Sequence, residues 1–80
     1  MKILRFNNWL QFQTAGEVLC RRHPGSSLKE LESNKSTGID SKAEWAWDYQ
    51  TMTFHFFSDE NRAEAKELFD ILGYKCEIVA

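Results

Sequence analysis

Large and small or polar side chains alternate on both sides of Gln50-Thr51, and this alternation is the clearest pattern in the chain. A period of two residues is typical of β-strands, because successive side chains of a strand point to opposite faces of the sheet. We therefore predict a hairpin over residues 45–57 with a two-residue turn at Gln50-Thr51. The large residues then share one face as cross-strand pairs, namely Tyr49 with Met52, Trp47 with Phe54 and Trp45 with Phe56. We assign this face mainly to the core, with Trp45 at the outer end of an edge strand that the helices do not reach.

A helical pattern follows the short apolar run of residues 2–6, which we predict to be the first strand. Asn8 and Gln11 resemble a capping box, and Pro24-Gly25 provides a stop, so we predict a helix over residues 9–22. A β-hairpin over the same residues, turning at Ala15-Gly16, is the alternative, because glycine inside a helix costs about 1 kcal/mol relative to alanine.

The C-terminal part of the chain has the signals of a capped helix followed by a strand. Ser58 precedes two acidic residues, which suit the positive end of a helix, and apolar residues then recur at helical spacing as far as Leu72. Gly73 occupies the position of a left-handed cap, and Tyr74 is placed to pack on Phe69. Residues 75–80 are predicted to form the last strand.

Between these halves, Ser27 and Glu30 form a second capping-box pattern, which predicts one or two helical turns through Leu31. Residues 34–42 are polar and rich in turn formers, so we predict a loop there. The order is then β-α-(short α)-β-β-α-β. We predict an α+β, ferredoxin-like βαββαβ domain, a four-stranded antiparallel sheet with two helices on one face. With the alternative hairpin, the fold would be a β-meander plus a C-terminal helix.

One family resemblance can be stated for residues 54–79. The aromatic strand Phe54–Phe57, the acidic helix start Ser58–Glu60 and the Leu72-Gly73-Tyr74 exit into the last strand resemble the C-terminal half of RraB-type regulators of ribonuclease E. The resemblance implies a non-catalytic protein inhibitor, and it assigns no functional residue.

Composition narrows the classes of function. The chain has 80 residues, 42% of them hydrophobic, which fits one globular domain over residues 1–80. A net charge of −2 argues against nucleic-acid binding, which usually requires a basic surplus. The start has no apolar run of signal-peptide or membrane-spanning length, so we expect no membrane partner and a cytoplasmic location. Cys20 and Cys76 are then expected to be reduced thiols, with a disulfide between them as the alternative.

Two groups of residues near the end of the first helix are candidates for chemistry. Cys20 and His23 would share one helix face, but a zinc site needs two further ligands and a nucleophile needs an oxyanion site. Arg21 and Arg22 lie where the helix dipole is negative, which disfavours a phosphate. We expect hydrated side chains here, with no metal, cofactor or catalytic residue. A Cys-dependent enzyme is the weaker alternative.

The smaller-residue face of the hairpin carries Asp48 and His55, with Arg5 nearby on the first strand. They suggest an acid–base pair, although a wet sheet face is the simpler interpretation. An RRM-like RNA-binding module is a further alternative, since RRM domains share this topology and stack bases on aromatic residues of their sheet. Phe54 and Phe56 are on the appropriate strand, but they share their face with the predicted core.

We therefore predict a small non-enzymatic domain that binds another protein, as a regulator or inhibitor that covers a partner's surface. The contact regions are the polar loop and the edge strand, because exposed aromatic residues are the usual hot spots of such interfaces. The edge strand would also allow a homodimer. The candidate protein-binding residues are Trp45, Trp47, Lys35, Asp40 and Lys42.

Overall fold

A computed structural model describes residues 1–79; residue 80, the last of the predicted final strand, lies outside the described part. The elements in chain order are β1 (Lys2–Phe6), α1 (Trp9–Arg22), β2 (Gly25–Ser27), α2 (Leu28–Ser36), β3 (Trp45–Asp48), β4 (Thr53–Phe56), α3 (Asp59–Leu72) and β5 (Cys76–Val79). The predicted helix over residues 9–22 is confirmed, and the alternative hairpin there is wrong.

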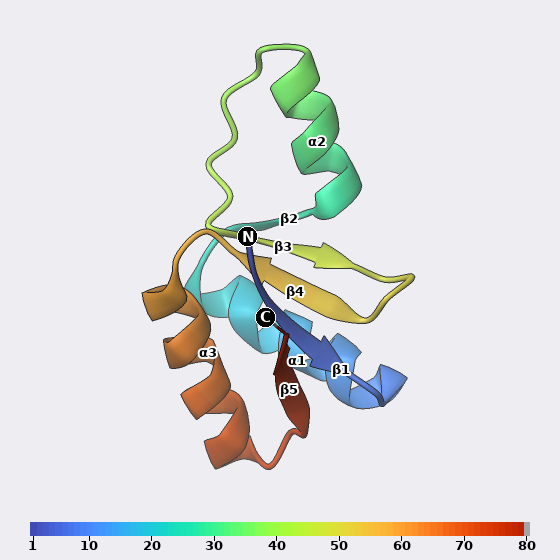
Figure 1. The fold of residues 1–80 in the computed structure, drawn as a ribbon, viewed down its shortest axis with the longest axis vertical. Coiled ribbons are helices and arrows are strands. Elements are labelled where there is room, and N and C mark those ends of the chain that lie inside the picture. The colour runs from blue at the N-terminus through green and yellow to red at the C-terminus, as the bar shows by residue number, and fades with distance from the viewer. Residues whose placement is uncertain (80) are drawn as a thin grey trace.

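The strands form one five-stranded sheet in the order β2-β3-β4-β1-β5 (Figure 1). The four predicted strands are present, and neighbours among them pair antiparallel. The α+β class is confirmed, but a sheet of four antiparallel strands is wrong, because β2 adds a parallel neighbour to β3. The chain therefore covers the edge that we expected β3 to expose.

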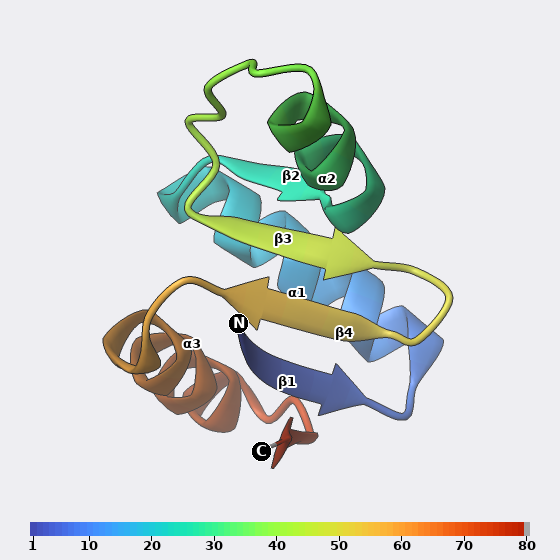
Figure 2. The same cartoon turned by 45° about the horizontal axis from the view of Figure 1, so that its top comes forward.

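The helices lie on both faces of the sheet. Phe6 of β1 packs edge-on against Phe12 of α1 and Phe69 of α3, so α1 and α3 share one face. Figure 2 shows α2 in front of the sheet, near β2 and β3, with α1 behind it. Ala46, on the face opposite the aromatic residues, is consequently buried. α2 thus forms a third layer over one end of the sheet, and the prediction of helices on one face only is wrong.

The hairpin has the predicted register but a longer turn. Trp47 pairs with Phe54 and Trp45 with Phe56, whereas a four-residue turn over residues 49–52 separates the strands. Asp48 Oδ1 accepts a hydrogen bond from the Gln50 amide, and Met52 adopts a left-handed φ of 54°. The core contains three of the six residues of the predicted face, together with apolar residues of β1, α1 and α3: Leu4, Phe6, Phe12, Ala15, Leu19, Trp45, Phe54, Phe56, Ala65 and Phe69.

The predicted caps bound all three helices of the described chain. The side chains of Asn8, Ser27 and Ser58 each accept a hydrogen bond from the amide three residues later. Gly73 ends α3 in the left-handed conformation, at φ 81°. α2 runs further than we predicted, through Ser36, so the loop begins three residues later than expected.

A close contact between Gly25 and Trp45 joins β2 to the core. The two residues are register partners, and a Cβ atom at Gly25 would lie 2.3 Å from Trp45 Cε2. The indole Nε1 of Trp45 donates a hydrogen bond of 3.0 Å to the carbonyl oxygen of His23. A glycine is required here because the indole occupies the volume that any side chain would need.

Candidate functional site

The five candidate contact residues occupy three different environments. Trp45 is only 2% exposed and belongs to the core, which corrects the expectation that it lies at an open edge. Trp47 is half-buried, and Lys35, Asp40 and Lys42 are exposed. The structure brings Lys35 and Asp40 to one hollow and the two tryptophans to another.

The first hollow, which we call the α2 groove, has a volume of about 630 Å³. α2, the loop after it, Met1 and Phe57 form its walls. None of the residues of α2 is fully buried, and Ile39 in the loop is exposed. Lys35 and Asp40 lie on the rim, whereas Lys42 is not part of the lining. This groove therefore collects apolar side chains that the fold does not cover.

The second hollow, the aromatic groove, has a volume of about 410 Å³ and lies between α1 and β3. Its aromatic lining residues are Phe12, Trp45, Trp47, Tyr49 and Phe54, and its rim comprises Gln13, Glu17, Cys20 and Arg21. Gly16 of α1 also lines the groove, and its missing side chain keeps the helix surface open toward Phe54.

Neighbouring rings hold the exposed aromatic residues of this groove in place. The centroid of the Tyr49 ring lies 5.6 Å from Trp9, 6.0 Å from Phe12 and 6.2 Å from Trp47. Tyr49 is nevertheless 57% exposed, and Trp9, which packs on Tyr49 beside the groove without lining it, is 48% exposed. Since Ser27 is the register partner of half-buried Trp47, β2 offers no large side chain to cover the Trp47 indole.

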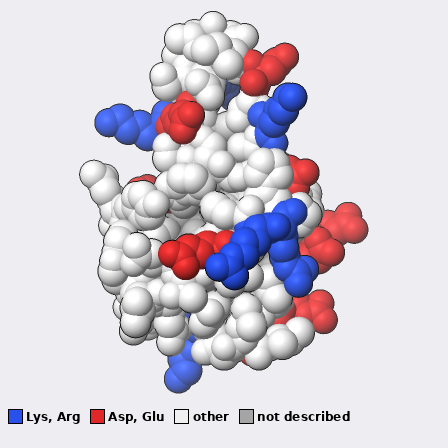
Figure 3. Space-filling view, turned by 180° about the vertical axis from the view of Figure 1, so that it is seen from behind, with Lys and Arg blue, Asp and Glu red and all other residues white. Residues whose placement is uncertain are grey.

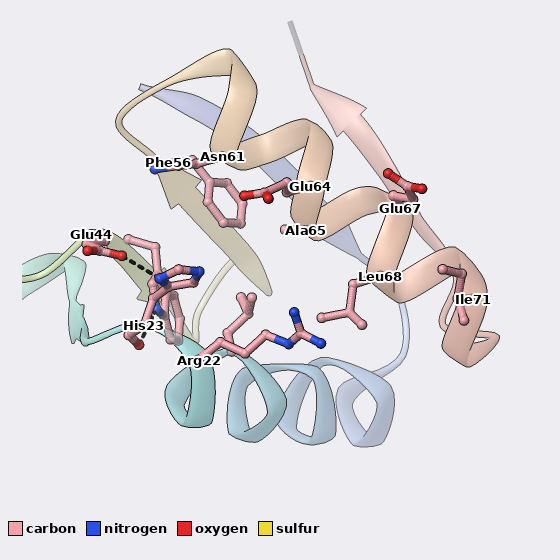
Figure 4. Close-up of a pocket in the computed structure, with 12 residues that line it drawn as sticks. Arg22, His23, Glu44, Phe56, Asn61, Glu64, Ala65, Glu67, Leu68 and Ile71 are labelled. Carbon is pink, nitrogen blue, oxygen red and sulfur yellow. Dashed lines mark hydrogen bonds and ion pairs between the residues drawn. The ribbon is translucent and has the colours of Figure 1, made fainter.

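A third hollow, the α1–α3 cleft, has a volume of about 270 Å³ (Figure 4). Arg22 and His23 come from the end of α1, whereas Asn61, Glu64 and Glu67 come from α3. At its mouth, His23 Nδ1 lies 2.6 Å from Glu44 Oε2. The cleft thus combines an apolar interior with charged walls.

The outer face of the sheet does not contain the acid–base pair that we considered. Arg5 forms an ion pair with Glu77, and Asp48 accepts from the Gln50 amide. His55 Nε2 lies 2.8 Å from the hydroxyl of Thr53. Burial lowers the pKa of His55, an effect that the charge of Asp48 partly offsets. Arg5, Asp48 and His55 thus each have a different partner, and the lowered pKa favours the neutral form of His55.

The same face argues against an RRM-like surface. Phe54 and Phe56 point toward the helices and are at most 2% exposed. The outer positions that β4 presents instead are Thr53 and His55. Base stacking of the RRM kind requires aromatic side chains on that outer face.

The two cysteines are free thiols, Cys20 exposed and Cys76 half-buried. Burial raises the pKa of both, and the charge of Glu17 raises that of Cys20 further. A raised pKa lowers the thiolate fraction, which is the reactive form. His23 is engaged by Glu44 through Nδ1. Within residues 1–79, no three His, Cys, Asp or Glu side chains are grouped so as to hold a metal ion.

Comparison with protein-family models, curated proteins and solved structures finds no match to this chain. None of the helices in residues 1–79 has both the length and the apolar character needed to cross a membrane.

The sequence contained a signal for the aromatic groove that we interpreted differently. We interpreted Gly16 as a residue that is unfavourable inside a helix and that could form the turn of the alternative hairpin, whereas its position over Phe54 opens the groove. Tyr49 was assigned to the core because it continues the alternation of β3, whereas the longer turn carries it out of the sheet.

Proposed function

We propose that this chain is a small, non-enzymatic, cytoplasmic protein-binding domain, a regulator that covers a partner's surface with its aromatic groove. The exposed cluster of Trp9, Tyr49 and half-buried Trp47 is the observation that supports this proposal most directly. Tryptophan and tyrosine are the residues most enriched at interface hot spots, because they combine large apolar area with few rotatable bonds.

The topology is compatible with this role but does not specify it. The strands β1, β3, β4 and β5 with α1 and α3 correspond to a ferredoxin-like unit, into which β2, α2 and the following loop are inserted. This fold supports many functions, so the proposal depends on the groove and not on the topology. The resemblance of residues 54–79 to RraB-type regulators is consistent with an inhibitor.

The aromatic groove is organised before any partner binds. Phe12 and Phe54 stack with centroids 4.6 Å apart beneath it, and both are at most 1% exposed. Exposed rings that pack on this buried pair lose little conformational freedom on binding, and this lowers the entropic cost of association. The groove suits an apolar or aromatic side chain of the partner, with Glu17 and Arg21 available at the rim for polar contacts.

The test is affinity capture from the native cell with the wild-type chain, followed by measurement of the dissociation constant for the captured protein. Tyr49→Ala should weaken binding at least about tenfold, as expected of a hot spot. Gly16→Leu, which places a side chain in the groove, should have a similar effect. Phe57→Ala is the matched control, because Phe57 is also exposed but lines the α2 groove.

Two outcomes would contradict this proposal. One is a partner that binds Tyr49→Ala and Gly16→Leu as tightly as the wild type. The other is capture that disappears on nuclease treatment and that weakens steeply with salt in direct RNA-binding measurements, which would favour nucleic acid as the ligand.

A further inference from the structure

We infer that the α1–α3 cleft is a second contact site, which takes a basic amphipathic segment of a protein. An apolar side chain of that segment would occupy the cleft, and its lysine or arginine side chains would lie against Glu64 and Glu67. This inference goes beyond the aromatic groove, because a different set of side chains supports it.

The interior of the cleft is apolar and formed by two helices and two strands of the sheet. Leu19 comes from α1, Trp45 and Phe56 from the sheet, and Ala65 and Leu68 from α3. Figure 4 shows Arg22 extending from α1 beneath Leu68, with Glu64 and Glu67 above on α3. A volume of about 270 Å³ has room for one large aliphatic side chain, not for a folded domain.

The charges of α3 are divided between two sides of the helix. Arg62 lies 3.5 Å from Asp59 and donates to the carbonyl oxygen of Val79, while Lys66 lies 2.5 Å from Asp70. Both basic residues of α3 are therefore engaged away from the cleft. Figure 3 shows acidic side chains along the side of the molecule that α3 forms.

The remaining acids of α3 lie together on one helix face, and two of them, Glu64 and Glu67, line the cleft. Glu60, Glu64 and Glu67 are spaced by four and three residues, so they share one helix face, and none has an ion-pair partner within residues 1–79. Like charges four residues apart destabilise a helix slightly. A cationic partner would relieve this repulsion, which an anionic partner would increase.

The wall of the cleft opposite α3 determines which groups of a bound segment would face each side. Glu44 is engaged by His23, so Arg22 is the one cation of the lining left to face the two glutamates of α3. A segment that presents cations to α3 and carbonyl oxygens to Arg22 would complement both walls. An acidic segment would place its charge beside Glu64 and Glu67, which is unfavourable.

The experiment uses two synthetic helical peptides with the same apolar positions, one with lysine and one with glutamate at every polar position. Binding to the complete chain is followed by amide NMR, with the amides of Ala65 and Leu68, which line the cleft and not the aromatic groove, as reporters. The lysine peptide should bind and shift these resonances, and added salt should weaken it. The glutamate peptide should not shift them.

Charge reversal locates the site. Glu64→Lys/Glu67→Lys should raise the dissociation constant of the lysine peptide at least about tenfold. Glu30→Lys/Glu32→Lys makes the same change in net charge on α2, and it should change the constant less than about twofold. Glu64→Gln/Glu67→Gln, a milder pair, serves if the reversed variant does not fold.

The inference is overturned if the two peptides bind equally, if the reversed and control variants bind equally, or if no cleft resonance moves at millimolar peptide. Tyr49→Ala should leave the lysine peptide bound. Its effect on the native partner is measured separately, so a failure of the cleft and a failure of the aromatic groove give different results.

Discussion

Gly25→Ala tests the packing that joins β2 to the core. The added Cβ would lie 2.3 Å and 2.4 Å from two atoms of the Trp45 ring, closer than van der Waals contact allows. The indole is only 2% exposed and donates a hydrogen bond to His23, so a shift away from the new methyl group would stretch or break that bond. Overpacking of this kind costs about 1–3 kcal/mol, and an unmade buried hydrogen bond adds about 1–3 kcal/mol.

We therefore expect Gly25→Ala to lower the free energy of unfolding by about 3 kcal/mol. The melting temperature should then fall by about 12–24 °C, since 1 kcal/mol corresponds to about 4–8 °C in a domain of this size. Urea unfolding followed by tryptophan fluorescence measures the change. Small domains are typically stable by about 5–15 kcal/mol, so the loss is large enough to measure without abolishing the fold.

Gly16→Ala is the matched control, because the same methyl group would lie 3.5 Å from the Phe54 ring, an ordinary contact. It should raise stability by about 0.5–1 kcal/mol through helix propensity. The reasoning is refuted if Gly25→Ala changes stability by less than about 0.5 kcal/mol. It is also refuted if Gly25→Ala costs as much in a Trp45→Leu background as in the wild type, since the cost should depend on the indole.

Three further predictions concern helix ends and pH. Ser58→Ala removes the acceptor of the Asn61 amide and should cost about 1 kcal/mol in urea unfolding; an unchanged midpoint would mean that water replaces this cap. Gly73→Ala should cost about 1–2 kcal/mol because of its left-handed φ, and Gly73→Asn should cost less. Burial lowers the pKa of His55, so protonation favours the unfolded chain, and stability should fall as pH decreases through about 6.5, the unfolded value. His55→Asn should reduce this loss between pH 7.5 and 5.5, whereas an identical pH profile would exclude His55 as its source.

Local signals in the sequence were sufficient for most of the elements. The caps at Asn8 and Ser58 and the left-handed Gly73 depend on hydrogen bonds and dihedral angles within a few residues, so a short window of sequence contains them. The hairpin register was also predictable, because a one-residue shift would have moved Trp47 and Phe54 to the other face.

β2 was not predictable by the same means. Its three residues, Gly25–Ser27, contain neither alternation nor a β-branched side chain. What makes them a strand is the complementarity of Gly25 to the indole of Trp45, a contact between residues 20 positions apart in the sequence. The placement of Trp45 was wrong for the same reason, since a covered edge is a tertiary property.

For the aromatic groove, the sequence predicted an exposed aromatic residue but not which residue it is. An aromatic hot spot was expected, but the residue that protrudes most, Tyr49, depends on a turn of four residues instead of two. β3 has a neighbouring strand on each side, so a second copy cannot pair along it as we predicted. The edge strands of the sheet are β2 and β5. Lys35, Asp40 and Lys42 were correctly placed at the surface, and whether they contact a partner stays a prediction.

Trp45 lines both the aromatic groove and the α1–α3 cleft, on opposite sides of α1. A ligand that shifts this indole from one side alters the shape that a second ligand meets on the other. Thermodynamic linkage then requires each ligand to change the affinity of the other by the same factor. One buried ring would thus make the two sites cooperative or mutually exclusive.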